Sequence, residues 1–348
     1  MSSFFNEIMS LLETREITEK AVWEDFLLGR KPATFLQSWN WGEVNVAVGY
    51  KIKRLGFFKS SGLMGVALLI HQPAKRGKHY LVPGGPVLDF SDRNFCKYVF
   101  SQIKRIAKED GVWFVRIRPD VKDDPALRAL MKEMGLKPAP MHVHGENTLV
   151  LDISQTEVEL MEGMRKTTRY SIRKSMNEGY QVTVSDDTSH IEELYKLQAE
   201  TVKRHKFVGF QKKLFWSELS IFSKDREALL FECKKGREIL ASAIVVFYGE
   251  KAFYHFSGSS QASRGTNASY YLQWEIIKKA KALGYKLYDF WGIAPRDDPR
   301  HRFWGVTVFK KGFGGVRVDW LHAHDLPLSY WYYLTYLFET GRRITRRL

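Results

Sequence analysis

The sequence is poor in cysteine and contains no long uninterrupted run of apolar residues. Its two cysteines, Cys96 and Cys233, lie far apart and lack metal-ligand spacing. A disulfide-rich scaffold is therefore excluded, and we expect a reduced, cytoplasmic protein. No stretch approaches the roughly 20 apolar residues that a membrane-spanning helix needs. The first residues, MSSFFNEIMSLLETREI, lack the basic and then apolar segments of a secretory signal, and we expect no signal peptide.

Motifs that would identify an enzyme class or a cofactor are also missing. The sequence has no Walker A loop, no HExxH, no GxSxG and no CxxC pair. The pairs His142/His144 and His322/His324 are spaced like strand residues, but no acidic or cysteine pattern completes a metal site. We therefore expect neither a metal nor a cofactor.

Positive charge is what the sequence has in excess. With 54 Lys and Arg against 39 Asp and Glu, the formal net charge is +15. This charge predicts attraction to a polyanion, either nucleic acid, an anionic membrane surface or a phosphorylated substrate. The densest stretch is RKTTRYSIRKS at 165–175, and a helix there would place Arg165, Arg169 and Arg173 on one face. The alternative is a solvated basic face on an ordinary surface helix.

A pattern of strand, strand, helix and strand occurs twice and predicts two similarly built α/β domains. The first copy is GLMGVALLIHQP, KHYLVPGGPVL, FCKYVFSQIKRIAKEDG and VWFVRIRP, and the second is EILASAIVVFYG, KAFYHFSGSS, SYYLQWEIIKKAKALG and YKLYDFWGI. Both helices stop at a glycine, Gly111 or Gly284, and the strands are rich in β-branched and aromatic residues. We place the boundary near 145–155, with domains over 1–150 and 151–319.

The end of the chain, PLSYWYYLTYLFETGRRITRRL, follows a different pattern. It predicts a helix crowded with aromatics and closed by arginines, at positions Arg342, Arg343, Arg346 and Arg347. Because the apolar faces of the first domain otherwise lack a cover, we expect residues 320–348 to pack back on that domain. The alternative, which can coexist with packing, is an anchor with aromatics at headgroup depth and arginines on anionic lipid.

Six short motifs stand out along the chain. They are FLQSWNWGE at 35–43, VRIRPDV at 115–121, TRYSIRKS at 168–175, YHFSGSS at 254–260, YDFWGI at 288–293 and HRFWGVTVFKKGFGG at 301–315. In this order they resemble the FemABX family of peptidoglycan-bridge aminoacyltransferases. The chain lacks the long helical hairpin of some members, so it resembles the short type without that arm.

The resemblance implies a fold, an activity and partners. The fold would be two tandem N-acetyltransferase-like domains with a groove between them. The activity would move an amino acid from aminoacyl-tRNA to an amino group on the stem peptide of a UDP- or lipid-linked muramyl-peptide precursor. No cofactor is implied. We expect a monomer that makes peripheral contact with the inner face of an anionic membrane.

The resemblance also implies roles for individual residues. Lys310 would supply positive charge beside the reacting ester, from a strand and with its ammonium facing open space. Lys311 would point to the opposite face and Phe309 to the core. Arg204 and Tyr254 would contact the nucleotide-pyrophosphate part of the acceptor. The basic residues Arg165, Arg169 and Arg173 would bind the tRNA or the pyrophosphate.

Two positions depart from the family pattern. Many relatives have a lysine shortly after WGE, where this chain has Asn45 and Val46. Relatives also often have an acid before the proline of the RIRP strand, where this chain has Arg118. If that acid accepts a proton in relatives, the route here must differ, through the substrate's own phosphate or through Asp120.

Two rival functions stay open at this stage. One keeps the fold but uses acyl-CoA or another thioester as donor, although the loop SQASRGTNASYY offers only Gly258 before it and Gly265 within it for pyrophosphate binding. The other is a non-catalytic module that binds RNA or a membrane. It accounts for the charge and the aromatic tail but not for YDFWGI and FKKGFGG.

Overall fold

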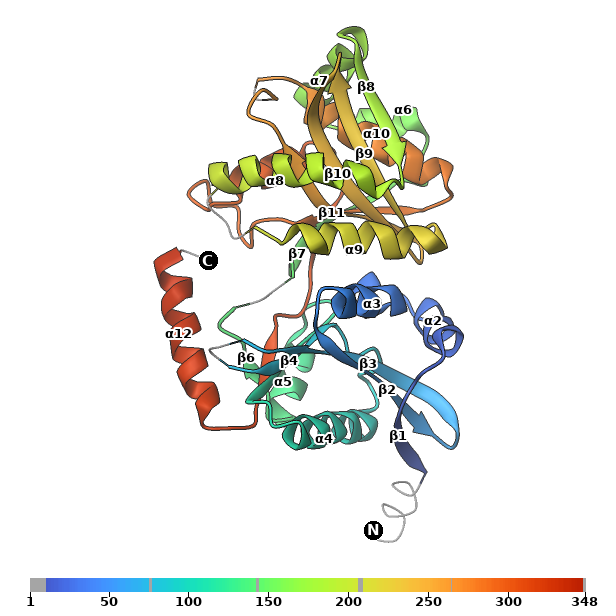
Figure 1. The fold of residues 1–348 in the computed structure, drawn as a ribbon. Helices are drawn as coiled ribbons and strands as arrows, with labels where there is room; N and C mark the ends of the chain where they lie inside the picture. The colour runs from blue at the N-terminus through green and yellow to red at the C-terminus, as the bar shows by residue number, and fades with distance from the viewer. Residues whose placement is uncertain (1–10, 75–76, 142–143, 206–208, 264, 347–348) are drawn as a thin grey trace. The chain divides into compact units, whose positions relative to one another are not determined.

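The computed structural model describes residues 11–74, 77–141, 144–205, 209–263 and 265–346 (Figure 1). The chain divides into two compact units. Unit 1 comprises the residues up to Glu146 together with those from Asp319 onward, and unit 2 comprises Asn147–Val318. Each unit is built on a seven-stranded mixed sheet with helices packed on it. The predicted α/β class is thereby confirmed.

Unit 1 has the strand order β1-β2-β3-β4-β5-β14-β6. Its strands are β1 (Leu12–Glu16), β2 (Lys51–Lys59), β3 (Gly62–Gln72), β4 (His79–Gly84), β5 (Phe114–Pro119), β6 (Lys137–Pro138) and β14 (His324–Pro327). Its helices are α2 (Lys20–Leu28), the 3-10 helix η1 (Phe35–Gln37), α3 (Trp39–Ala47), α4 (Arg93–Glu109), α5 (Pro125–Glu133) and α12 (Trp331–Arg346). Both chain segments of unit 1 therefore contribute strands to one sheet.

The sequence of α4 explains how the core of unit 1 forms. The Asp92 side chain caps its N-terminus by accepting a hydrogen bond from the Phe95 amide, and the chain leaves the helix at Gly111 with φ +65°. Its apolar side packs on every second residue of the central strands, such as Val115 and Ile117 of β5. α4 thus connects the parallel strands β4 and β5 and covers one face of the sheet.

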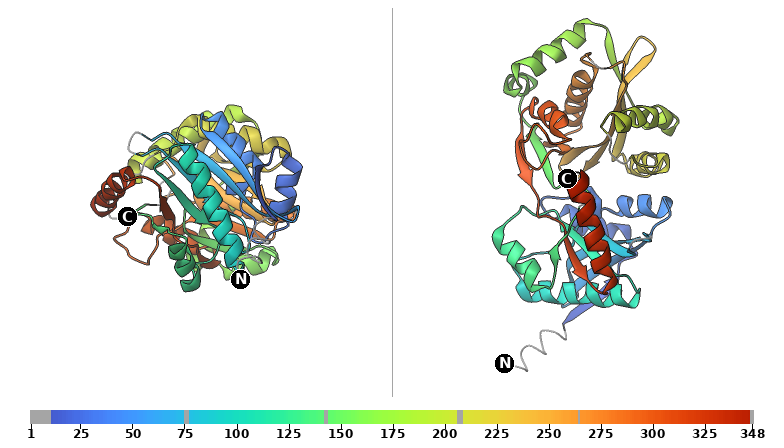
Figure 2. Two further views of the ribbon diagram at one scale, coloured as in Figure 1. Left: turned by 90° about the horizontal axis from the view of Figure 1, so that it is seen from below. Right: turned by 90° about the vertical axis from the view of Figure 1, so that its left-hand side faces the viewer.

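The opposite face of this sheet carries α12, which Figure 2 shows in red in its right-hand view. Tyr332 of α12 lies 5.3 Å from Phe114 of β5, ring centre to ring centre. β14, just before α12, pairs antiparallel with β5. The C-terminal segment is therefore part of unit 1.

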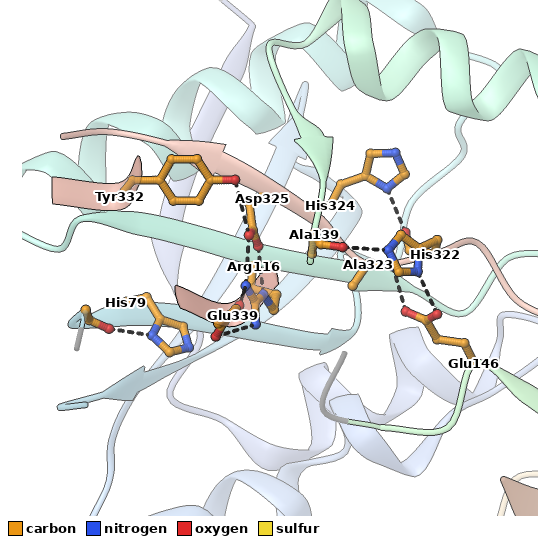
Figure 3. A network of polar contacts seen from close by, with 11 residues as sticks. His79, Arg116, Ala139, Glu146, His322, Ala323, His324, Asp325, Tyr332 and Glu339 are labelled. Carbon is orange, nitrogen blue, oxygen red and sulfur yellow. Dashed lines mark hydrogen bonds and ion pairs between the residues drawn. The ribbon is translucent and has the colours of Figure 1, made fainter. Parts of the chain in front are cut away.

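A buried ionic network fixes α12 to the sheet (Figure 3). The Arg116 guanidinium donates to both carboxylate oxygens of Asp325 on β14, at 2.7 and 2.8 Å, and to Glu339 on α12 at 2.7 Å. Arg116 and Asp325 are buried, and Tyr332 donates to the same aspartate at 3.4 Å. Charges removed from water in this way are tolerated because each has a partner of opposite sign.

Unit 2 has the strand order β13-β7-β12-β11-β10-β9-β8. Its strands are β7 (Asn147–Asp152), β8 (Tyr180–Ser185), β9 (Ala228–Lys235), β10 (Glu238–Tyr248), β11 (Lys251–Ser259), β12 (Leu287–Gly292) and β13 (Val316–Asp319). Its helices are α6 (Glu157–Gly163), α7 (Lys166–Asn177), η2 (Thr188–His190), α8 (Ile191–His205), α9 (Lys212–Phe222), η3 (Ser223–Asp225), α10 (Ala268–Ala282) and α11 (Trp304–Lys311).

The predicted repeat is confirmed in strand order and strand direction. In unit 1, β3 and β4 are antiparallel and β4 and β5 are parallel, with α4 between the parallel pair. In unit 2, β10 and β11 are antiparallel and β11 and β12 are parallel, with α10 between them. α10 leaves its last turn through Gly284 at φ +89°, as α4 does through Gly111. Figure 1 shows α10 on one face of this sheet and α8 and α9 on the other.

Candidate functional site

The strands β11 and β12 of unit 2 are paired over only part of their length. Their parallel ladder runs from Lys251↔Leu287 to Phe253↔Asp289. β11 continues to Ser259 and β12 to Gly292, so both strands extend beyond the ladder that joins them. Backbone N–H and C=O groups next to such a divergence are suited to receive a ligand, because they need hydrogen-bond partners. Buried polar side chains gather at this point, which we therefore take as the candidate site.

Asp289 holds the end of β12 in an unusual conformation. Its buried carboxylate accepts a hydrogen bond from the Thr148 hydroxyl of β7 and, at 2.8 Å, from the backbone amide of Trp291. Trp291 has φ +64°, in the left-handed region that residues other than glycine rarely adopt. Such a conformation costs on the order of 1–3 kcal/mol, and residues strained in this way cluster at functional sites. The motif YDFWGI thus encodes a fixed, strained turn.

Lys310 of α11 reaches the carbonyl just after this turn. Its ammonium donates to the Gly292 oxygen at 2.7 Å, and the residue is only 6% exposed. Burial lowers the pKa of Lys310 to about 7, and the nearby Asp289 carboxylate opposes this change. At neutral pH both the charged and the neutral form of this side chain are therefore populated. A titratable group perturbed this strongly is a candidate for catalysis.

The prediction that Lys310 lies on a strand with its ammonium in open space is wrong. Residues 304–311 form a helix, and Lys310 is buried. In a helix, Thr307 and Lys310 are three residues apart and face inward together. Lys311 does not sit on an opposite strand face but forms an ion pair with Asp297 at 2.6 Å. Phe309 packs against the core of unit 2, as predicted.

Tyr254 directly follows Phe253, the last residue of β11 that pairs with β12. Its ring packs against the core of unit 2, beside α10. Burial raises the pKa of Tyr254, and hydrogen bonds with Ser257 and Gln273 oppose this change. The same glutamine accepts a hydrogen bond from Tyr288 at 2.7 Å. Tyr254 is thus a neutral hydroxyl at the divergence of the strands, and its contact with a substrate stays a prediction.

We call Arg165, Arg169 and Arg173 the α7 cluster. Arg169 and Arg173 lie in helix α7 as predicted, whereas Arg165 precedes it with an extended backbone, so the prediction of three arginines on one helix face is wrong for Arg165. Arg165 is the N-cap of α7, Arg169 donates to the carbonyl oxygens of Glu162 and Met164, and Arg173 is exposed. The Arg165 amide donates at 2.9 Å to the carbonyl oxygen of Gly312, the C-cap of the Lys310 helix. The start of the α7 cluster therefore lies beside the end of α11.

The close packing of α7 on α11 requires a glycine. A Cβ added at Gly312 would lie 2.4 Å from the Thr168 hydroxyl and 3.0 Å from an Arg165 guanidinium nitrogen. No side chain could be accommodated there without moving α7. The glycine of FKKGFGG therefore holds the basic helix and the lysine helix together within unit 2.

Arg204 belongs to helix α8 of unit 2, but its side chain lies outside the described part of the chain. Its predicted contact with the acceptor stays a prediction.

The two departures from the family pattern lie in unit 1. Arg118 is buried at the end of β5 and forms an ion pair with Asp120 at 2.7 Å. Asp120 is thus held by a neighbouring cation. Asn45 is also buried, and its side-chain amide donates to the Trp41 carbonyl at 2.8 Å inside α3. Both residues have local structural partners.

Among the residues that the structure describes, no group of three or more His, Cys, Asp or Glu side chains could hold a metal ion. His142 lies outside the described residues. His322 contacts the Glu146 carboxylate at 2.7 Å and the Ala139 carbonyl at 2.8 Å, and this pairing raises its pKa against the effect of burial (Figure 3). Within unit 1 this histidine therefore joins two separate chain segments.

The arrangement around Lys310 can stabilise a negative charge that develops on an oxygen. An ammonium stabilises such a charge more strongly in a site that excludes water than in solvent. The ammonium of Lys310 is already held in place by the Gly292 carbonyl. The sequence motifs indicate Lys310 as a site residue but predict no role for Asp289, Trp291 or Gly292, although all three lie within YDFWGI. The signal for Asp289 was an acid placed inside an otherwise apolar strand.

Comparisons with known proteins match a family model and several individual proteins. The FemAB family matches residues 18–125 and 223–337, well over half of the chain. Similar proteins include the lipid II:glycine glycyltransferases of Staphylococcus aureus strains MRSA252 and USA300. Each is 22% identical over 381 residues, which is 87% of this chain and 90% of theirs.

Solved structures show the same fold. FemX has a TM-score of 0.81 at 20% identity, over 94% of this chain and 100% of that chain. A tandem GNAT protein from the clavulanic acid biosynthesis pathway has a TM-score of 0.58 at 10% identity, over 91% of this chain and 99% of its own. The two repeated units thus have counterparts in other tandem proteins.

Proposed function

The chain belongs to the FemAB family, and on this premise we propose that it is an aminoacyltransferase of peptidoglycan bridge synthesis. The donor is aminoacyl-tRNA, and the acceptor is an amino group on the stem peptide of a UDP- or lipid-linked muramyl peptide. The likeness to glycyltransferases along 87% of the chain supports the reaction class. The observation that carries the proposal is the buried ammonium of Lys310 beside the strained turn of β12.

The chemistry needs few groups from the protein. An aminoacyl ester is already activated, so the acceptor amine can attack its carbonyl carbon without an enzyme nucleophile. The attack places a negative charge on the carbonyl oxygen, and the ammonium of Lys310 stabilises that charge. Collapse of the intermediate breaks the bond to the ribose oxygen of the tRNA. Only the protonated form of Lys310 can do this, so its contribution falls as the pH rises through about 7.

The donor tRNA would meet the α7 cluster. Arginine contacts phosphate bidentately, and each phosphate contact adds salt-dependent affinity. The hydrogen bond between the Arg165 amide and Gly312 links this helix to the helix of Lys310. A phosphate backbone bound along α7 would therefore lie close to the catalytic lysine. A tRNA donor also places the reaction in the cytoplasm, and we expect the protein to act as a monomer.

The outer side of α12 fits peripheral contact with an anionic membrane. Tyr332, Thr335 and Glu339 face the sheet, whereas the opposite side is apolar and exposed. We call the exposed residues the α12 face: Trp331, Leu334, Leu337, Phe338 and Ile344.

Arginine follows this apolar face along the helix, and the Arg342 guanidinium lies 5.7 Å from the centre of the Phe338 ring. None of the described helices is long and apolar enough to cross a bilayer. An apolar face followed by basic residues is typical of a helix that lies in the headgroup region of anionic lipid.

The reaction is tested by offering a pool of charged tRNAs with either a UDP-linked or a lipid-linked muramyl pentapeptide. Mass spectrometry of the acceptor identifies the amino acid and the position that gains it. Acetyl-CoA in place of the tRNA pool tests the rival thioester donor. Transfer from tRNA alone supports the proposal, and modification only with the thioester would replace it.

A further inference from the structure

A β-bulge in β11 places a histidine at the candidate site. The register between β10 and β11 shifts so that Ile244 pairs with Phe256 and Val245 with Tyr254, which leaves His255 as the extra residue. A bulge re-aims side chains that would otherwise alternate between the faces of a sheet. Both His255 and Phe256 accordingly contact side chains of α9.

His255 forms a buried pair with a carboxylate. Its Nδ1 atom lies 2.7 Å from an oxygen of Glu218 on α9, and the two side chains are 4% and 0% exposed. The other oxygen of Glu218 is also buried and has no hydrogen-bond partner among the described residues. A carboxylate left partly unsatisfied in the interior is costly, which argues for more than a packing role. A carboxylate that accepts a hydrogen bond from Nδ1–H fixes the tautomer in which Nε2 is the basic nitrogen.

The pair adjoins the turn that Lys310 contacts. The His255 ring lies 5.0 Å from the Trp291 ring, in an edge-to-face arrangement. Trp291 is the strained residue, and the next carbonyl along the chain, that of Gly292, accepts the hydrogen bond of Lys310. A single turn thus connects a buried ammonium with a buried imidazole–carboxylate pair.

We propose that His255 accepts the proton that the acceptor amine loses, and that Glu218 positions the imidazole and stabilises it when protonated. This inference rests on the proposed aminoacyl transfer. The amine nitrogen bonds to the ester carbon as its proton moves to His255. The carbon–oxygen bond to the tRNA then breaks, and His255 returns the proton to the departing ribose oxygen. The imidazole ends unchanged, and no further reactant is needed.

The groups that surround His255 and its strand come from α9, α8 and β12. From α9 the facing charge is Glu218 itself. From α8, the uncharged residues Leu197, Gln198 and Thr201 contact β11. On β12, the Asp289 carboxylate is bonded to Thr148 and to the Trp291 amide.

The test uses the full-length protein, with the aminoacyl-tRNA and muramyl peptide that the parent accepts. His255→Gln should lower kcat by about 10²–10⁴-fold with little change in KM, the usual contribution of a general base. The acidic limb of the pH–rate profile, where the imidazole becomes protonated, should disappear. His322→Gln is a matched control, because His322 has the same 2.7 Å contact between Nδ1 and a glutamate in unit 1. It should leave the limb and kcat nearly unchanged.

Glu218→Gln provides a second variant that keeps the histidine. Without the negative charge the protonated imidazole is less favourable, so the acidic limb should move to lower pH. Thermal unfolding identifies which variants are folded. A folded His255→Gln protein with the parent's kcat and pH–rate profile would overturn the proposal that His255 is the base. If His255→Gln does not fold, an acidic limb that stays at the same pH in Glu218→Gln would overturn it. If the parent protein transfers no amino acid, the proposed function itself is wrong, and there is then no acceptor proton for His255 to take.

Discussion

Replacing Lys310 by methionine should slow the reaction and stabilise the protein at the same time. The pKa of Lys310 lies near 7 instead of the ordinary 10.5. Each pKa unit corresponds to 1.36 kcal/mol, so this difference of about 3.5 units corresponds to about 5 kcal/mol. Below pH 7, burial of the charged lysine therefore lowers the free energy of unfolding by about 5 kcal/mol. The lost hydrogen bond to the Gly292 carbonyl offsets about 1.5–3 kcal/mol of that gain. We expect the variant to be more stable by about 2–3.5 kcal/mol.

The pH dependence of this gain distinguishes it from a general packing effect. Between pH 7 and 10.5 the unfolded chain binds the lysine proton and the folded chain does not, so the parent gains stability as the pH rises. The difference between Lys310→Met and the parent should therefore shrink from pH 6.5 to pH 9.5. Urea unfolding followed by tryptophan fluorescence measures it at each pH. Lys311→Met, which loses only the ion pair with Asp297, should show no such trend.

Turnover should change in the opposite direction to stability. Loss of one group that stabilises an oxyanion typically costs about 10²–10³-fold in kcat, with a smaller effect on acceptor binding. A Lys310→Met protein that keeps the parent's kcat would remove this residue from the mechanism. A variant less stable than the parent by the same amount at every pH would refute the buried, perturbed lysine.

Three further perturbations test other parts of the structure. Alanine at the three arginines of the α7 cluster should weaken tRNA binding and reduce the slope of log K against log salt concentration by up to about 3. A variant with alanine at Lys104, Arg105 and Lys108 of α4 is the control. If the α7 variant binds tRNA as tightly as the parent, the cluster is only a solvated face. Glutamate at both leucines of the α12 face should reduce co-sedimentation with anionic vesicles, and equal sedimentation of two folded proteins would leave α12 only a packing role. Arg116→Met should lower the unfolding free energy by about 3–5 kcal/mol, because Asp325 stays buried without its cation, whereas adding Asp325→Asn should recover part of the loss in urea unfolding. No recovery in the double variant would contradict that explanation.

Local sequence patterns predicted the repeat because each element carries its own signal. α4 and α10 are apolar at helical spacing, and both end at a glycine with positive φ. The strands β3 and β10 are largely apolar, and β10 is also rich in β-branched residues. The basic stretch after Met164 is a helix for the same reason, with Thr168 and Ile172 buried and the charged residues outside.

The helix of Lys310 could not be predicted in this way. WGVTVFKK is rich in β-branched and aromatic residues, a composition typical of strands. Contacts with residues outside the helix decide the outcome: the Thr307 hydroxyl accepts a hydrogen bond from the Ala294 amide. Lys310 then finds its partner on β12. The pairs of His255 with Glu218 and Arg116 with Asp325 join residues 37 and 209 positions apart, and neither has a local signal.

The central claim is that the amino acid leaves a tRNA ester and joins a stem-peptide amine with the help of Lys310. A single-turnover reaction with isotopically labelled aminoacyl-tRNA and muramyl pentapeptide tests it most directly. The label should appear in an amide on the stem peptide with the parent protein and with Lys311→Met, and about 10²–10³-fold more slowly with Lys310→Met. Label that stays on the tRNA with the parent protein, or moves equally fast with Lys310→Met, would contradict the claim.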